Sequence, residues 1–141
     1  MAQEIQGTHY VGEVAQKAFI VEDGKVLMCR AFGFTRWDFP GGRIHREENP
    51  HEGLLREVKE ELGVEIEIKR PFSVSVTDDT PNGMPRYFIL FEAFLKDPGA
   101  EFVLAPDEIE EIRWVSLEDV STIETWKDWK VILEDYYHEH P

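Results

Sequence analysis

Apolar positions along the chain follow two periods, which predict a set of strands and two helices. Residues 13–23 and 25–32 are mainly apolar and predict two strands joined by a hairpin at Asp23-Gly24, a pair that favours tight turns. The same reading predicts further strands at residues 64–70, 72–77, 86–95 and 110–117, and a short strand at Trp37 to Phe39. Because residues 86–95 are apolar almost throughout, that strand is expected in the centre of the sheet.

A helix is predicted at residues 50–62, with signals at both ends. Asn49 is a favoured N-cap residue, Pro50 fits the first helical position, and Gly63 suits the position after the last turn. At 100° per residue, one side of the helix carries the apolar residues Leu54, Leu55, Val58 and Leu62, and the other carries Glu57, Glu60 and Glu61. The apolar side is expected to face the sheet and the acidic side to point away from it.

The C-terminal segment, residues 122–138, predicts a second helix. Its apolar residues recur at helical spacing, at Trp126, Trp129, Leu133 and Tyr136. We interpret Trp126 and Trp129 as core or dimer residues rather than as a base-binding pocket. Strands interleaved with two separated helices predict an α/β (α+β) layered fold, and a length of 141 residues suits one domain over residues 1–141.

Composition excludes several classes of protein. Hydrophobic residues make up 42% of the chain, which argues against disorder. No apolar run approaches the roughly 20 residues of a membrane span, and the first residues lack the pattern of a signal peptide. Cys29 is the only cysteine, which excludes an internal disulfide and a cysteine-rich zinc site. A cytoplasmic location without a membrane partner is therefore expected.

Charge is distributed unevenly along the chain. The formal net charge of −14 weighs against a nucleic-acid polymer as partner, because such binding depends on basic residues that neutralise phosphates. Residues 30–46, however, contain four arginines and a single acid, Asp38. These arginines are Arg30, Arg36, Arg43 and Arg46. A small basic region in an acidic protein suits a small anionic ligand, and the alternative is a solvated arginine-rich loop.

The acidic side of the first helix suggests a metal site. Like charges one turn apart repel each other and weaken a helix, so a cation is expected against Glu57, Glu60 and Glu61. Carboxylate oxygens suit magnesium or manganese. Gly53 leaves space on this side, and Gly41-Gly42 is expected to form a tight turn with accessible backbone groups. The alternative is a glutamate-rich surface helix in an acidic chain.

The full spacing around this helix resembles the Nudix box. Gly42 is followed after five residues by Glu48, and after seven more by Arg56-Glu57-Val58, Glu60-Glu61 and Gly63-Val64. The flanking segments WDFPGG and EIRWVSLED are also similar to the family. The resemblance implies an α/β/α sandwich with a mixed β-sheet. It also implies that magnesium or manganese supports hydrolysis of a nucleoside diphosphate linked to another moiety, with water attacking phosphorus.

The resemblance also assigns roles to residues of this chain. Metal ligands would be Glu57, Glu60, Glu61, the backbone carbonyl of Gly41, and a further acid before Trp114. The candidates for that acid are Glu108, Glu110 and Glu111, of which spacing favours Glu108. Glu57 or Glu61 would also act as the catalytic base, and Arg56 would orient the carboxylates through charge-assisted hydrogen bonds. His45 and Glu47 depart from the commonest family wording, and Glu47 would adopt a positive φ less readily than glycine.

Residues that would contact the substrate are less constrained by the pattern. Arg30 and Arg43 are the candidate phosphate contacts, while Phe34 and Trp37 either stack on a base or pack against the sheet. The loop at residues 78–85, DDTPNGMP, is expected to be flexible, to lie near the site and to set the selectivity. It contains Pro81, which lies 17 residues beyond the box, near where members that hydrolyse ADP-ribose tend to carry a proline.

Several functions are consistent with these patterns. The intact box favours a metal-dependent pyrophosphohydrolase acting on a small nucleotide, either an ADP-ribose-like nucleotide sugar or a modified nucleoside triphosphate. The alternative is a non-catalytic, nucleotide-sensing module of the same fold, which loss of a box carboxylate would have favoured. A cap-removing RNA hydrolase is disfavoured by the charge of −14. Whether the chain forms a homodimer stays open.

Overall fold

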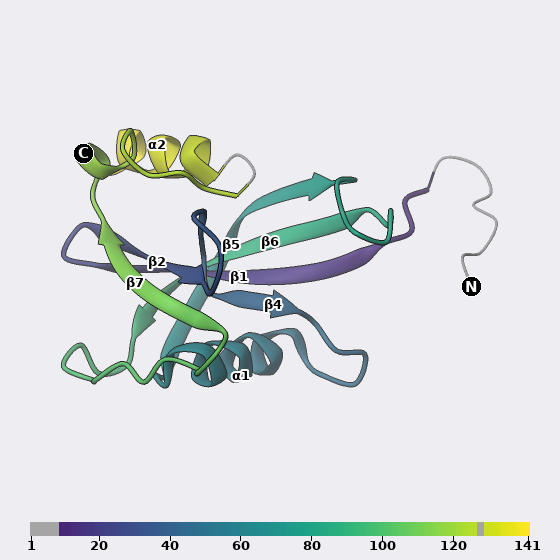
Figure 1. The fold of residues 1–141 in the computed structure, drawn as a ribbon, viewed down its shortest axis with the longest axis horizontal. Helices are drawn as coiled ribbons and strands as arrows, with labels where there is room; N and C mark the ends of the chain where they lie inside the picture. The colour runs from purple at the N-terminus through teal and green to yellow at the C-terminus, as the bar shows by residue number, and fades with distance from the viewer. Residues whose placement is uncertain (1–8, 127–128) are drawn as a thin grey trace.

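A mixed β-sheet lies between two helices in the computed structural model, which describes residues 9–126 and 129–141. Helix α1 (Pro50–Leu62) covers one face of the sheet and helix α2 (Trp129–Glu139) covers the other (Figure 1). The described strands are β1 (Glu13–Glu22), β2 (Lys25–Ala31), β3 (Trp37–Asp38), β4 (Gly41–Arg43), β5 (Ile66–Thr77), β6 (Arg86–Leu95) and β7 (Ile109–Val115), followed by a short 3-10 turn, η1 (Leu117–Asp119). The predicted layered fold is confirmed. No helix in the described residues is both long and apolar enough to cross a membrane.

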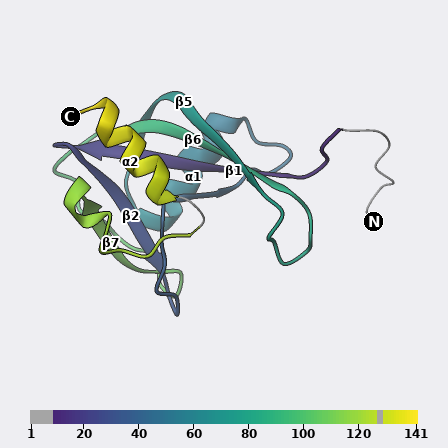
Figure 2. The same ribbon diagram turned by 90° about the horizontal axis from the view of Figure 1, so that it is seen from above.

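Strand β1 pairs with three other strands of the sheet. Its first half pairs antiparallel with β4 and its last residues pair antiparallel with β2, while β6 runs parallel beside it. Strand β5 continues the sheet beyond β6, and β2 also pairs with β3 and β7. The strand predicted to be central, β6, lies between β1 and β5 as expected. Seen from above, β5 and β7 lie on opposite sides of the molecule (Figure 2).

The β1–β2 hairpin forms where it was predicted. Asp23 and Gly24 both have positive φ angles, 50° and 73°. These are the values that a two-residue turn with the natural strand twist requires, and Asp and Gly tolerate them better than most residues. The hairpin prediction is confirmed.

Each helix buries an apolar core against its own face of the sheet. One cluster joins Leu54, Val58 and Leu62 of α1 to β-strand residues such as Ile20 and Ala93. The other joins α2 to the opposite face, with Trp129 and Leu133 among its most buried residues. Leu55 is 38% exposed, so the prediction that it faces the sheet is wrong. The buried stripe of α1 is narrower than the helical wheel suggested.

The two strands predicted on either side of Pro71 are one strand in the structure. Strand β5 runs without a break from Ile66 to Thr77. Two shifts of register, between Ile68 and Arg70 and between Pro71 and Ser73, accommodate the proline. Proline is tolerated at bulges and on outer strands because no ladder hydrogen bond is lost there, and β5 is the last strand in the described order.

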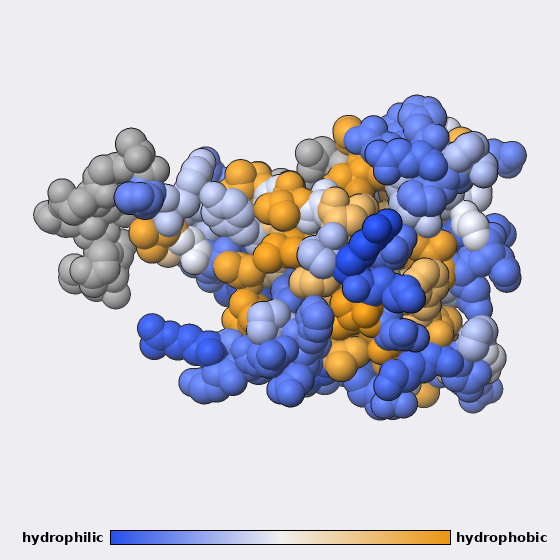
Figure 3. Space-filling view, turned by 180° about the vertical axis from the view of Figure 1, so that it is seen from behind, coloured by the Kyte–Doolittle hydropathy of each residue, from blue (hydrophilic) through white to orange (hydrophobic). Residues whose placement is uncertain are grey.

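The outer position of β5 leaves apolar side chains at the surface. Phe72, Val74 and Val76 are all at least 38% exposed. Seen from behind, hydrophobic residues form a band between the polar surfaces at the top and bottom of the molecule (Figure 3). The amphipathic pattern of this strand therefore does not place every apolar residue in a core.

The C-terminal helix begins later than predicted. Helix α2 starts at Trp129, whereas the spacing predicted a start at residue 122. Thr125 forms a parallel bridge with Trp37, and the backbone N–H of Trp126 donates to the Trp37 carbonyl at 3.1 Å. These contacts hold the segment extended against β3. Residues 127–128, inside the predicted helix, lie outside the described part of the chain.

The Gly41-Gly42 pair forms strand β4 rather than the predicted tight turn. Gly41 has a φ of 139°, and a Cβ atom there would lie 2.1 Å from the carbonyl oxygen of Gln16. At Gly42 a Cβ would lie 2.8 Å from the carboxyl carbon of Glu57. Gly41 is required because β4 approaches the backbone of β1 closely, and the missing side chain at Gly42 leaves the space that the Glu57 carboxylate fills.

We expect Gly41→Ala to destabilise the protein by more than about 3 kcal/mol, because the new methyl group meets backbone atoms that cannot rotate away. Gly83→Ala is the matched control. Gly83 also has a positive φ, 73°, but nothing lies within 4 Å of its Cβ position, so about 1 kcal/mol is expected. Urea unfolding of the metal-free proteins measures both values. Equal losses would show that close packing at β4 does not matter.

Candidate active site

The box glutamates do not all point away from the sheet. The Glu61 carboxylate accepts a hydrogen bond from the Gly41 N–H at 2.8 Å, and Glu57 lies against Gly42. Glu60 is exposed. The prediction that the whole acidic side faces away from the sheet is therefore wrong for Glu57 and Glu61. Both carboxylates lie in the gap between α1 and β4, where the absence of side chains on the glycines gives them space.

Arg56 links several carboxylates near the start of α1. Its guanidinium donates two hydrogen bonds to Glu48, one of them at 2.9 Å, and lies 3.2 Å from Glu57 and 3.1 Å from Glu60. The hydrogen bonds from Arg56 lower the pKa of Glu48 to about 2, and those to Glu48 are the main cause of the raised Arg56 pKa. Arg56 therefore contacts two box carboxylates, with Glu48 as its main partner, and its catalytic role stays a prediction.

The glycine at position 53 serves a different purpose from the one predicted. Gly53 is buried, and a Cβ atom there would lie 3.1 Å from a carboxylate oxygen of Glu48 and 3.6 Å from the amide nitrogen of Gln16. The Gln16 amide in turn donates to the Pro50 carbonyl at 2.8 Å. The space left by the missing side chain is thus filled by Glu48 and Gln16, which connect the first turn of α1 to the adjacent loop and to β1.

Burial shifts the protonation of Glu61. The pKa of its carboxyl group is raised to about 7, mainly by loss of solvent; Lys17 and the Gly41 N–H act to lower this pKa, and the nearby charges of Glu57 and Asp38 act to raise it. A buried carboxylate of this kind is costly to ionise unless a cation accompanies it. Its oxygen donors fit magnesium or manganese.

The remaining ligands are not gathered around Glu61. Within residues 9–126 and 129–141, no three His, Cys, Asp or Glu side chains lie close enough together to form a complete metal site. The donors fit the metal in type, and Glu57 and Glu61 share the gap beside β4. Glu60 instead pairs with Arg56, so metal binding would require its side chain to turn.

The loop that carries Glu108 lies next to the end of α1. The Ala105 N–H donates to the Glu61 carbonyl at 2.9 Å. Glu108 is exposed, whereas the alternative candidates Glu110 and Glu111 both bind Arg30, at 3.0 and 2.8 Å. The preference for Glu108 is therefore consistent with the pairing of its neighbours, and its role as a ligand stays a prediction.

Lys17 and Asp38 were missed by the sequence analysis. Lys17 is only 8% exposed although it is charged, and its ammonium lies 3.1 Å from an Asp38 carboxylate oxygen. The other oxygen of Asp38 accepts from the Phe39 N–H and the Trp129 indole, both at 2.8 Å. The available signal was a lysine inside an apolar strand, since such residues are rarely buried without a partner.

A cleft of about 680 Å³ opens beside Lys17 and Asp38. Its opposite wall is the loop at residues 78–85, and its lining consists of Lys17, Arg36, Asp38, Thr77, Asp79, Thr80, Pro81, Arg86, Phe88, Trp126 and Trp129. Within the loop, the Thr80 hydroxyl hydrogen-bonds the Met84 carbonyl at 2.7 Å and Asn82 at 3.0 Å, and the flexibility of the loop stays a prediction. The cleft is large enough for part of a nucleotide.

The predicted substrate residues lie in several places. Trp37 is 8% exposed and belongs to the core, so it is not a platform for a base. Phe34 is 49% exposed, and its ring packs 5.5 Å from that of Trp126. Arg30 is engaged by the two glutamates before Trp114. Trp126, interpreted from the sequence as a core or dimer residue, packs against the core and also lines the cleft, and Trp129, which lines the cleft too, is buried as expected.

Arg43 lies on the other side of the start of α1. It pairs with Glu13 at 3.2 Å and lines a separate groove with His45 and Arg46. His45 lies 3.5 Å from Glu48. Glu47 is not among the residues with positive φ, so the departure from the family wording at this position introduces no backbone strain of that kind. The structure does not bring Arg43 and Arg30 together in one cleft.

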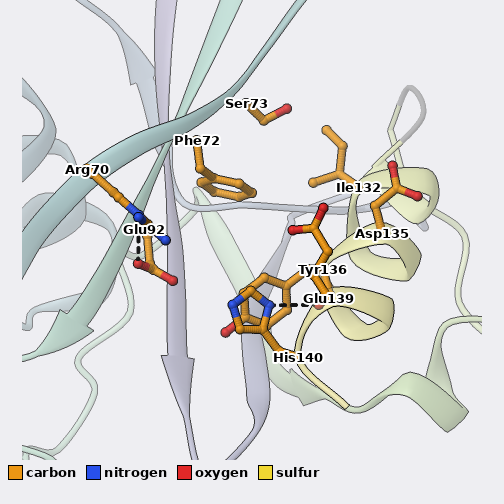
Figure 4. A pocket seen from close by; sticks show the side chains of 9 residues that line it. All are labelled: Arg70, Phe72, Ser73, Glu92, Ile132, Asp135, Tyr136, Glu139 and His140. Atoms are coloured by element: carbon orange, nitrogen blue, oxygen red, sulfur yellow. Dashed lines mark hydrogen bonds and ion pairs between the residues drawn. The ribbon is translucent and has the colours of Figure 1, made fainter.

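A smaller cleft of about 200 Å³ lies between β5 and α2 (Figure 4). Phe72 and Tyr136 flank it, and Arg70 lies 3.6 Å from Glu92 at its edge. None of the box glutamates lines it, and neither does Lys17. The larger cleft is therefore the candidate substrate site.

Comparisons with known proteins agree with this geometry. A family model described as NUDIX domain matches residues 14–135. An RNA pyrophosphohydrolase of Marinomonas sp. (strain MWYL1) is 39% identical over 66 residues, which cover 47% of this chain and 37% of that protein. Nudix hydrolase 2 of Arabidopsis thaliana is 31% identical over 108 residues, which cover 72% of this chain and 38% of that protein. The chain thus spans less than half the length of these two relatives.

A solved structure extends the likeness over almost the whole chain. The crystal structure of the MutT protein from Methanosarcina mazei Go1 has a TM-score of 0.75 and 25% sequence identity. The match covers 95% of this chain and 99% of that one. The arrangement of sheet and helices is therefore shared with a protein of nearly equal extent.

The raised pKa of Glu61 predicts how the metal-free protein responds to pH. The unfolded state loses the Glu61 proton near the ordinary carboxyl pKa of 4.5, whereas the folded state retains it up to a pKa of about 7. The contribution of Glu61 to the free energy of unfolding therefore falls as pH rises from about 4.5 to about 7. Glu61→Gln cannot titrate and should lose this part of the pH dependence. Urea unfolding in EDTA across this range measures it, and identical slopes for variant and wild type would contradict the prediction.

Proposed function

The chain belongs to the NUDIX domain family, and on that premise we propose that it is a metal-dependent pyrophosphohydrolase. Its substrate would be a nucleoside diphosphate linked to another moiety, cleaved by attack of water on phosphorus. The observation that carries this proposal is the position of Glu57 and Glu61. Both lie against the glycines of β4, and Lys17, whose charge acts on Glu61, lines the larger cleft.

Magnesium or manganese would be held by Glu57, Glu60 and Glu61, the carbonyl of Gly41, and Glu108. When bound, such a cation neutralises the diphosphate and lowers the pKa of a coordinated water. The donors suit this role, because all are oxygens and Glu61 is a buried carboxylate that a cation would stabilise.

The residues of the chain would then position the reactants. Arg56 holds Glu57 by an ion pair and keeps it oriented along α1. Glu57 or Glu61 would accept the proton of the attacking water, since both carboxylates lie in the gap beside β4. The walls of the cleft would hold the nucleoside, and the bonds around Thr80 would keep the loop in place while it is bound.

The size and charge of the site support a small nucleotide. The cleft of about 680 Å³ suits part of an ADP-ribose-like nucleotide sugar or a modified nucleoside triphosphate. The net charge of −14 would repel a long phosphate chain at physiological salt. Cytoplasmic location and a homodimer stay predictions.

RNA is the second candidate substrate. The Marinomonas relative is named an RNA pyrophosphohydrolase, and the groove with Arg43 and Arg46, which also contains Glu13 and Glu48, lies next to the start of α1. A non-catalytic sensor is the remaining alternative. All the box carboxylates are present in the sequence, so no missing group favours a sensor over an enzyme.

We expect Glu57→Gln and Glu61→Gln each to lower turnover at least about a hundredfold, as for loss of a metal ligand or base. Glu52→Gln is the matched control, because Glu52 lies in the first turn of the same helix and outside the proposed ligand set. Steady-state rates in magnesium measure the effect, with EDTA as a second arm. Turnover above about a third of wild type in both variants, or full activity in EDTA, would contradict the proposal.

Loop 78–85 should control the choice of substrate. Thr80→Val removes the hydroxyl that bonds Met84 and Asn82, and we expect it to change the ranking of kcat/KM among small nucleotides while metal dependence is kept. Thr122→Val removes a comparable hydroxyl bond outside the cleft and is the control. The panel contains ADP-ribose, modified nucleoside triphosphates and capped RNA. Faster cleavage of capped RNA than of every small nucleotide would establish the RNA candidate instead.

A further inference from the structure

Lys17 is an unusual residue for its position in the sheet. It lies in β1 between buried neighbours, and its side chain is 10% exposed. Burying an ammonium group costs several kcal/mol unless it is paired and hydrogen-bonded. An apolar residue would pack at this position without the cost of burying a charge. The presence of a charged residue therefore suggests that the ammonium group has a function.

The contacts of Lys17 account for only part of its bonding capacity. An ammonium has three N–H donors, and among the described residues the hydrogen bond to Asp38 is the only one that Lys17 makes. Burial acts to lower its pKa, but the charges of Asp38 and Glu61 outweigh burial and raise it. The group is therefore a cation that is bound to Asp38, lies in the field of Glu61 and has further N–H donors available.

Lys17 connects the cleft with the box carboxylates. It lines the cleft of about 680 Å³, and in the sheet it stands opposite Gly41, whose N–H binds Glu61. The other cations of this cleft are already paired: Arg36 lies 3.2 Å from Glu124, and Arg86 lies 2.9 Å from Glu13. Among the described cleft residues, Lys17 is the cation whose charge acts on Glu61.

We propose that Lys17 is a phosphate-binding residue that holds the diphosphate of the substrate between the cleft and the glutamates of α1. The proposal rests on the proposed function and adds a residue outside the box motif. Asp38 keeps the ammonium in place, and the remaining N–H donors bind the phosphate oxygens. Both oxygens of Asp38 accept hydrogen bonds, from Lys17, the Phe39 N–H and the Trp129 indole, and its role in the proposal is to position Lys17.

The test is binding of methylenediphosphonate, a diphosphate analogue that carries no base and cannot be hydrolysed. Lys17→Met alone would leave Asp38 without its partner, so the double variant Lys17→Met/Asp38→Asn removes both charges together. We expect its Kd for the probe in magnesium to rise at least about tenfold, as for loss of a charge-assisted hydrogen bond. The double variant Arg113→Met/Asp119→Asn removes an ion pair of the same kind outside the cleft and should stay within about threefold of wild type.

A structural role gives a different result. If Lys17 only stabilises the fold, the two variants should differ in melting temperature and not in Kd, and that outcome overturns the proposal, as does absence of probe binding to the wild type. In turnover assays the double variant should raise KM more than it lowers kcat. Probe binding needs no hydrolysis. The contribution of Lys17 to diphosphate affinity is therefore measured separately from enzymatic activity.

Discussion

The close contact between α1 and β4 is the constraint on which the candidate site depends. The Glu61 carboxylate reaches the backbone N–H of Gly41, and Glu57 lies where a side chain at position 42 would stand. A single methyl group on either glycine would collide with its surroundings. Two partly buried carboxylates can therefore lie between a helix and a strand because β4 presents bare backbone to them.

Two opposite electrostatic environments follow from this packing. At the first turns of α1, the guanidinium of Arg56 favours ionised carboxylates and lowers the pKa of Glu48. Two turns on, burial raises the pKa of Glu61. Glu48, in the loop before α1, is thus held ionised by Arg56, whereas Glu61, in the last turn of α1, lacks full compensation. Groups whose environments separate their pKa values in this way are characteristic of functional sites.

Pairing among side chains also limits which arginines can serve a ligand. Arg30 lies between Glu110 and Glu111, and Arg43 pairs with Glu13. Both come from the basic region that the sequence identified, yet they end on different surfaces. Lys17, from an apolar strand, reaches the cleft instead. The net charge of a segment is therefore a poor guide to the charge that faces a ligand, because the acids that pair with it come from distant segments.

Local signals account for most of the fold that could be predicted. The hairpin at Asp23-Gly24 and the limits of α1 depend on residues adjacent in the chain, and both were predicted correctly. The errors arose where distant contacts outweighed local preference. Pro71 stays within one strand because β6 pairs on both sides of its bulges, and the segment before Trp129 is extended because β3 holds it.

The sequence by itself determined the family resemblance and the identity of the box residues, since both depend on the spacing of a continuous segment. Only the tertiary structure decided which carboxylates are buried, that Gly41 and Gly42 form a strand, and that Lys17 and Asp38 adjoin the site. Lys17, Asp38 and Glu61 come from separate elements, and their proximity follows from the pairing of β1 with β4 and the packing of α1 against it. Periodicity describes one element at a time, so it contains no information on how separate elements meet.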